Sequence, residues 1–244
     1  MRLISPATRL LAVAALPLAL VACSPSGTKA AAPAPASPSA AKPSAAAADE
    51  GPNKGLLTGT QLKAALAPAT FFADGYAPDP AASRDTGDTY QLPEAASVPT
   101  PDCTKLGGTS WIEITGITGV SFAQDSYVNK DSSSQQAQEI DVYRGTTSAT
   151  VLGALGMISK ACPSYTDADT HSKVTVSEKP LTGVGDGAFT ITLTSPAWKG
   201  GTTLVAARVG TSVVTVLVSS GTDEGMKGAT KLTNQLVTSL KGKA

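Results

Sequence analysis

The amino-acid sequence predicts an α+β fold: an antiparallel sheet of about six strands, with helices packed mainly on one face. Two observations carry this prediction. Short runs of alternating apolar and polar residues follow one another through connections too short for crossovers, which favours antiparallel hairpins. Segments near residues 147–162 and 223–240 instead place apolar residues at helical spacing, as helices that cover a sheet do.

Residues 1–22 predict a secretory signal peptide. Arg2 and Arg9 supply its positive region, and residues 10–20 are apolar, interrupted only by Pro17. A stretch of this length is too short to cross a bilayer as a helix, which needs about 20 residues. The segment therefore predicts export and not a transmembrane span.

The signal ends in a bacterial lipobox, Leu20-Val21-Ala22-Cys23. In such a motif the cysteine thiol takes a diacylglycerol before cleavage, so Cys23 becomes the first residue of a lipoprotein. Two or three acyl chains, such as palmitate, anchor firmly at about 0.8 kcal/mol per buried methylene. An ordinary signal peptide with cleavage elsewhere is the alternative. The predicted location is the extracytoplasmic face of the cell membrane.

The segment 24–55 contains Ala, Pro, Ser and a few charges, and it has no large apolar residue. Such a composition cannot offset the entropy of ordering the chain, so residues 23–55 predict a lipidated, disordered tether. As a coil it would span on the order of 30 Å. The remainder, residues 56–244, is of a length that suits one domain.

The charge balance bears on the partners. Basic and acidic residues number 19 each, and removal of Arg2 and Arg9 leaves a formal charge of −2. No basic surplus exists to neutralise phosphates, so nucleic acid is not an expected partner. The expected partners are the membrane, through the lipid on Cys23, and a small molecule, a wall fragment or another envelope protein.

Two cysteines remain in the mature domain, Cys103 and Cys162. In an exported protein such a pair most simply forms a disulfide. Closing a loop of this length stabilises a fold by about 4 kcal/mol in the chain-entropy estimate. The alternative is a thiol pair that binds a metal or does redox work, but the CxxC spacing typical of such sites is missing.

The domain opens with a short helix. Thr58 and Gln61 form a capping box, which predicts a helix over residues 59–66 that Pro68 ends. Further on, Thr100 as N-cap and Gly116 as stop predict a helix between them. Its apolar side would consist of Cys103, Leu106, Trp111 and Ile114.

Between these helices, residues 69–99 lack periodicity and are rich in Pro, Gly, Ala and Asp. A stretch of this kind is usually mobile or a covering loop. Its four aromatic residues are candidates for a pocket wall: Phe71, Phe72, Tyr76 and Tyr90. Filling the domain's own core is the favoured role of Phe71 and Phe72, so the predicted ligand-binding residues are Tyr76 and Tyr90.

The remaining elements follow from periodicity and turn residues. Strands are predicted over residues 120–128, 136–143, 172–179, 187–194, 202–209 and 212–219. A helix over 147–162 ends at Pro163, and its buried stripe includes Cys162. A last helix begins at Asp223, with the stripe Ala229, Leu232, Leu236 and Leu240.

The sequence does not contain a recognisable set of catalytic or metal-binding residues. The single histidine, His171, lies in a polar stretch, and no GxSxG motif offers a nucleophile. The aspartates around it lack the pattern of a calcium loop. We therefore expect no enzyme activity, no metal and no cofactor.

Carboxylates offer the alternative of a wall-modifying hydrolase. The candidates are Glu113, Asp125, Glu139 and Asp141. The last two alternate with Ile140 and Val142, so they point away from that apolar face, and we expect them to be solvated.

Taken together, several motifs resemble actinobacterial lipoproteins related to the extracytoplasmic sensor domain of PknH-type kinases. They are the lipobox with its tether, a cysteine before the first strand pair, a helix ending in Ala161-Cys162-Pro163, and the turn at residues 181–186. The resemblance spans residues 56–240. It implies a disulfide-braced sheet with a cleft for an unidentified ligand and no catalytic residues. The kinase sensor has a second disulfide, for which this chain lacks the cysteines.

The favoured hypothesis is a non-catalytic, lipid-anchored, extracytoplasmic binding or sensor-like domain. A carboxylate hydrolase and a structural envelope lipoprotein are the alternatives.

Overall fold

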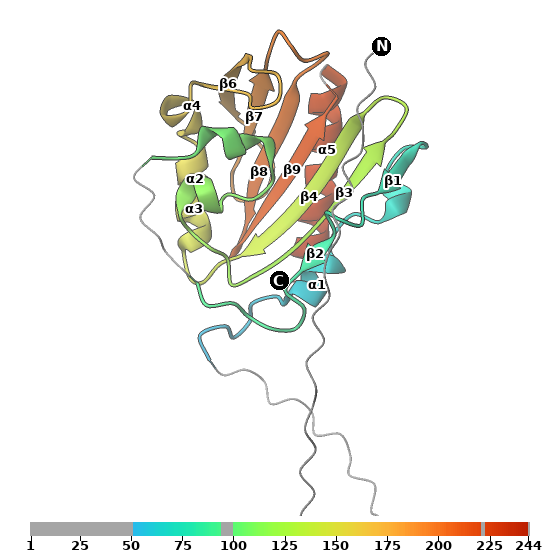
Figure 1. Ribbon diagram of the computed structural model, residues 1–244. Coiled ribbons are helices and arrows are strands. Elements are labelled where there is room, and N and C mark those ends of the chain that lie inside the picture. The colour runs from blue at the N-terminus through green and yellow to red at the C-terminus, as the bar shows by residue number, and fades with distance from the viewer. Residues whose placement is uncertain (1–50, 94–99, 221–222, 244) are drawn as a thin grey trace, which may run out of the picture. The chain divides into compact units, whose positions relative to one another are not determined.

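The computed structural model describes residues 51–93, 100–220 and 223–243. Within them the chain forms a nine-stranded antiparallel sheet in the order β1-β3-β4-β9-β8-β7-β6-β5, with β2 also paired to β3 (Figure 1). The predicted signal peptide, Cys23 and the tether up to residue 50 lie outside the described residues. The α+β class is confirmed, and the strand number exceeds the six expected.

The strands are β1 (Tyr76–Pro78), β2 (Arg84–Asp85), β3 (Ser121–Asn129), β4 (Ser134–Val142), β5 (Ser164–Thr166), β6 (Lys173–Pro180), β7 (Ala188–Thr194), β8 (Thr202–Val209) and β9 (Ser212–Ser219). The helices are α1 (Gly59–Lys63), α2 (Ile112–Thr115), α3 (Thr147–Leu155), α4 (Ile158–Ala161) and α5 (Asp223–Lys241), with 3-10 turns η1 (Ala69–Phe71) and η2 (Cys103–Gly107).

The six predicted strands are all present, and β8 and β9 have the predicted bounds. Gly210 adopts a left-handed conformation (φ 57°) in the tight turn between them, as the sequence indicates. The three additional strands, β1, β2 and β5, contain only two or three residues each. Strands this short carry too little alternation to be recognised, and they form because a longer neighbour offers its free edge.

The expectation that helices lie mainly on one face is wrong. Helix α5 packs on one face through Leu232 and Leu236, against Val205 of β8 and Val216 of β9. The opposite face packs against α2, α3 and α4 (Figure 1). Both faces of β9 are buried, as the unbroken burial of Val213 to Val218 shows, so each face of the sheet has a cover.

Two predicted helices are interrupted. The helix expected over 147–162 breaks into α3 and α4 at Gly156, where a Cβ atom would lie 2.4 Å from the ring of Phe189. The helix expected from Thr100 is instead η2 followed by α2, and its N-cap is Asp102. Gly107 and Gly108 separate the two pieces, because glycine disfavours a continuous helix.

The disulfide between Cys103 and Cys162 is present, with the two Cα atoms 5.5 Å apart. It joins η2 to the end of α4. Residues 51–55, at the end of the predicted tether, form turns, and Arg144 Nε donates a hydrogen bond of 2.8 Å to Asn53 Oδ1. Of the helices formed by the described residues, none has the length and apolar composition that crossing a membrane requires.

Candidate functional site

One row of polar side chains crosses four strands on the face opposite α5. The sheet register places Arg84 of β2 beside Gln124 of β3, Gln124 beside Glu139 of β4, and Glu139 beside Thr215 of β9. Neighbouring strands lie about 4.8 Å apart, so the four side chains form a continuous band. Asp141 extends the band, because residues two apart on a strand share a face.

Glu139 and Asp141 are buried, with exposed fractions of only 3% and 8%. The alternation with Ile140 and Val142 was predicted correctly, since those two residues face α5. The inference that the carboxylates are solvated is wrong. Their face carries the η2–α2 segment, of which Trp111 and Ile114 are buried in the same core as Tyr143.

The two carboxyl groups differ in their hydrogen bonds. Thr109 Oγ1 donates to Glu139 Oε2. Beside this pair, the indole Nε1 of Trp111 donates to Thr215 Oγ1 over 2.6 Å. Asp141 Oδ2 is buried and has no hydrogen-bond partner among the described residues. An unsatisfied buried oxygen is costly, so a carboxyl group left this way is a candidate for a functional role.

Burial raises the pKa of the Glu139 carboxyl, against the smaller lowering effect of the Thr109 hydrogen bond. Burial also raises the pKa of Asp141 well above its ordinary value, and the nearby Glu139 adds to this. The pKa of Tyr143 is raised by burial and by both carboxyl groups. Two acids that cannot easily ionise together therefore face the same space, and groups perturbed in this way concentrate at functional sites.

These carboxyl groups line an open cavity of about 190 Å³, which we call the carboxyl pocket. Its walls come from β2, β3, β4 and the segment around α2. The lining residues are Arg84, Gln91, Ser110, Ile112, Thr118, Gly119, Phe122, Gln124, Glu139 and Asp141. The pocket thus combines an acidic pair with a guanidinium and two apolar side chains. Such an arrangement can bind a small polar molecule in a defined orientation.

Replacement of Asp141 with asparagine is expected to raise the free energy of unfolding at neutral pH by about 1 to 3 kcal/mol. Because the folded-state pKa of this acid is raised, the unfolded chain releases the proton first, and stability falls as pH rises above about 4. Asparagine does not ionise, so the variant should not show this part of the fall in stability as pH rises. Urea denaturation at pH 5 and pH 8 measures it.

The matched control is Asp169→Asn, at an exposed position in the turn before β6. It should leave both stability and its pH dependence unchanged. Glu139, Tyr143 and Arg84, which share the surroundings of Asp141, remain in the variant. Equal pH slopes for wild type and Asp141→Asn would contradict the assignment of a raised pKa to this carboxyl group.

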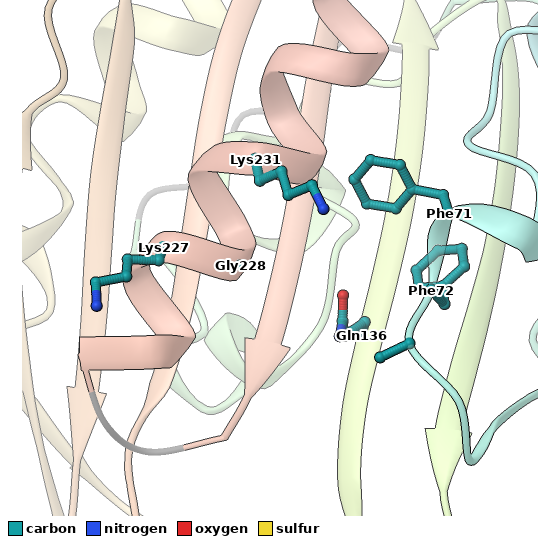
Figure 2. A pocket seen from close by; sticks show the side chains of 7 residues that line it. Phe71, Phe72, Gln136, Lys227, Gly228 and Lys231 are labelled. Atoms are coloured by element: carbon teal, nitrogen blue, oxygen red, sulfur yellow. The ribbon is translucent and has the colours of Figure 1, made fainter.

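A second hollow, on the α5 face, is the aromatic groove of about 400 Å³. It is lined by Phe71, Phe72, Ala73, Gln136, Lys227, Gly228 and Lys231 (Figure 2). Lys231 Nζ lies 5.1 Å from the centre of the Phe71 ring, so its ammonium group already makes a cation–π contact. Phe72 is buried and stacks on Tyr127 with ring centres 3.7 Å apart. The groove is larger than the carboxyl pocket, but none of the described residues that line it has a buried side-chain oxygen or nitrogen without a hydrogen-bond partner.

The aromatic residues of the 69–99 segment therefore divide. Phe72 fills the core, and Phe71 packs against that core at the edge of the groove. Tyr76 lies on β1 and Tyr90 donates from its hydroxyl to Leu56 O over 2.6 Å; both pack against the α5-side core. Neither tyrosine lines the aromatic groove or the carboxyl pocket. Their part in ligand binding stays a prediction.

The other acidic candidates lie apart from the pair. Glu113 is exposed and pairs with Lys105 over 3.4 Å. Asp125 faces the α5 side, where it accepts a 2.7 Å hydrogen bond from Gln138 Nε2. His171 is exposed, with a left-handed backbone (φ 52°). Within the part of the chain that the structure describes, no three His, Cys, Asp or Glu side chains gather as metal ligands.

Arg84, Thr109 and Trp111 belong to the site, and sequence reasoning did not assign them to it. Their relation to Glu139 depends on strand register and on the path of the η2–α2 segment. The alternation of Glu139 and Asp141 in a strand was the one signal available, and it indicated a shared face.

Comparison with known proteins shows similarity at the level of the fold. No family model and no curated protein matches the chain. Among solved structures, the crystal structure of the extracellular domain of PknH from Mycobacterium tuberculosis is similar, with a TM-score of 0.53 and 14% sequence identity. The match covers 75% of this chain and 97% of that one. The predicted likeness to the PknH extracellular domain is thereby supported at the level of the fold.

Proposed function

We propose that the protein is a lipid-anchored, non-catalytic binding domain of the sensor kind, displayed on the extracytoplasmic face of the membrane, with the carboxyl pocket as its ligand site. The observation that carries the proposal is the buried carboxyl group of Asp141, which lines an open pocket and whose Oδ2 has no hydrogen-bond partner among the described residues. A bound molecule would satisfy it. Similarity of the fold to the extracellular domain of PknH and the disulfide support placement outside the cytoplasm.

Ligand binding is tested by purifying the chain from its native envelope and identifying small molecules released on denaturation by mass spectrometry. We expect one compound at stoichiometric yield from the wild type and from the exposed control Asp169→Asn. It should be lost from Asp141→Asn and Glu139→Gln. A compound recovered equally from all four proteins would exclude this pocket, and an empty wild type that no envelope extract stabilises would exclude a binding function.

The second candidate is a carboxylate hydrolase, which the two raised carboxyl pKa values favour. The geometry opposes it. Glu139 and Asp141 project from the same side of one strand, whereas glycoside hydrolases place two carboxyl groups on either side of the bond that breaks. Turnover of a wall glycan that disappears in Glu139→Gln and in Asp141→Asn would establish the enzyme.

The anchor has its own test. Replacement of Cys23 with alanine is expected to abolish lipidation, because the diacylglycerol attaches through the thiol. The wild type should partition into the detergent phase and carry acyl mass, and the variant should do neither. Ser24→Ala serves as the control that keeps the thiol. Membrane retention of Cys23→Ala equal to that of the wild type would contradict the lipobox assignment.

A further inference from the structure

The carboxyl pocket presents charges of opposite sign at two positions. Glu139 and Asp141 are buried. Arg84 is exposed, lies two strands away in the same row, and donates from Nη2 to Gln124 Oε1 over 3.2 Å. A guanidinium has five N–H donors, so donors remain for a ligand at the mouth of the pocket. Strand spacing puts the backbones of Arg84 and Glu139 about 10 Å apart, within reach of one small molecule between their side chains.

The size of the pocket limits the ligand. The carboxyl pocket has a volume of about 190 Å³. This is below the range of about 300 to 1,000 Å³ that is usual for drug-sized ligands. The half-buried ring of Phe122 and the exposed side chain of Ile112 add a short apolar stretch of wall.

A metal ion suits this site less well than an organic cation. Calcium takes six to eight oxygen ligands. The described residues bring no third acidic, histidine or cysteine side chain to the pair, and the guanidinium of Arg84 lines the same pocket. An ammonium group needs only a few acceptors, and the carboxyl groups of Glu139 and Asp141, which both line the pocket, supply them.

We propose that the carboxyl pocket binds a free amino acid as its zwitterion, with the ammonium group at Glu139 and Asp141 and the carboxylate at Arg84. This inference rests on the proposed function and names the chemical class of its ligand. Arginine and carboxylate groups form bidentate pairs, which orients the molecule. The ammonium compensates the buried acids, whose charge is otherwise unfavourable.

The test is calorimetric titration of the full chain, made unlipidated by Cys23→Ala, with a panel of L- and D-amino acids. For the tightest binder, the amide (ammonium without carboxylate) and the N-acetyl derivative (carboxylate without ammonium) are then titrated. We expect saturable binding of the zwitterion and at least about tenfold weaker binding of each blocked form, equal to about 1.4 kcal/mol per lost charge.

Variants separate recognition from general damage to the fold. Arg84→Gln should weaken binding of the zwitterion but leave that of the amide unchanged, since the amide has no carboxylate to lose. Asp141→Asn should weaken both ligands that carry the ammonium group. The exposed controls Lys199→Gln and Asp169→Asn should match the parent, and circular dichroism verifies that all variants fold.

Three outcomes would overturn the inference: no binding by any amino acid, equal binding of the zwitterion and its N-acetyl form, or equal losses for zwitterion and amide in Arg84→Gln. The native protein could also release a neutral or anionic compound that the Asp141→Asn variant does not bind. That result would overturn the assignment of a zwitterionic ligand while leaving the proposed binding function in place. If the native protein releases no compound and no envelope extract stabilises it, the proposed binding function itself would be excluded.

Discussion

Replacement of Trp111 with alanine is expected to lower the free energy of unfolding by about 3 to 5 kcal/mol, the usual cost of removing a buried tryptophan. The side chain is 1% exposed and belongs to the core between the sheet and α3. Its indole also donates to Thr215 in the centre of the sheet, 104 residues away in sequence. Against a typical net stability of about 5 to 15 kcal/mol the loss is large.

The same substitution should also disturb the carboxyl pocket. Trp111 precedes α2, whose first residue, Ile112, is part of the pocket wall. Without the indole, the segment that covers Glu139 and Asp141 loses its hydrogen bond to Thr215 and the packing of its largest buried side chain. We therefore expect weaker ligand binding together with the lower denaturation midpoint.

Two further variants divide the effect into packing and hydrogen bonding. Trp111→Phe retains most of the apolar area but removes the N–H donor, so its cost should be smaller. A double-mutant cycle of Trp111→Phe with Thr215→Val isolates the coupling between the two side chains. Trp198→Ala is the control, because that residue is only half-buried in the loop before β8. A cost for Trp111→Ala no larger than for Trp198→Ala would contradict the structural role.

Replacement of Cys103 with serine is expected to cost about 2 to 5 kcal/mol. The bond closes a loop between residues 59 positions apart, and opening it restores entropy to the unfolded chain. Cys162 is fully buried and ends α4, whereas Cys103 begins η2. The bond therefore ties the η2–α2 segment, which supplies one wall of the carboxyl pocket, to the end of α4.

Urea denaturation of wild type and variant, with and without reductant, measures this contribution. Reduced wild type should unfold at nearly the same urea concentration as Cys103→Ser, and reductant should leave the variant unchanged. The slope of the free energy with urea should rise in the variant, since an unfolded chain without the cross-link exposes more surface. Two reactive thiols in the native exported protein would contradict the disulfide.

Much of the central sheet was predictable because its signals are local. In β8 and β9 the apolar runs meet at Gly210, whose backbone conformation suits a tight turn, and both strands have the expected bounds. The disulfide was predictable from the number of cysteines and the expected compartment. The need for glycine at residue 156, where the helix breaks, was not, because it depends on the ring of Phe189, which comes from β7.

The carboxyl pocket was only half predictable. Alternation placed Glu139 and Asp141 on one face of a strand, which is correct. Their burial depends on which segment covers that face. The covering segment is held in place by the hydrogen bond from Trp111 to Thr215 and by the disulfide between Cys103 and Cys162. These are contacts between distant parts of the chain, and no pattern near residue 139 encodes them.

Periodicity and turn residues thus specified the α+β class and the six longer strands, because these follow from the backbone geometry of residues close together in the sequence. The number of cysteines specified the disulfide, because only two remain in the mature domain. Tertiary packing decided that helices cover both faces, that Arg84 shares a row with Glu139, and that Asp141 Oδ2 is buried with no hydrogen-bond partner among the described residues. The physical reason is that the solvation of a polar group depends on everything packed around it, and register and long-range contacts determine that surrounding.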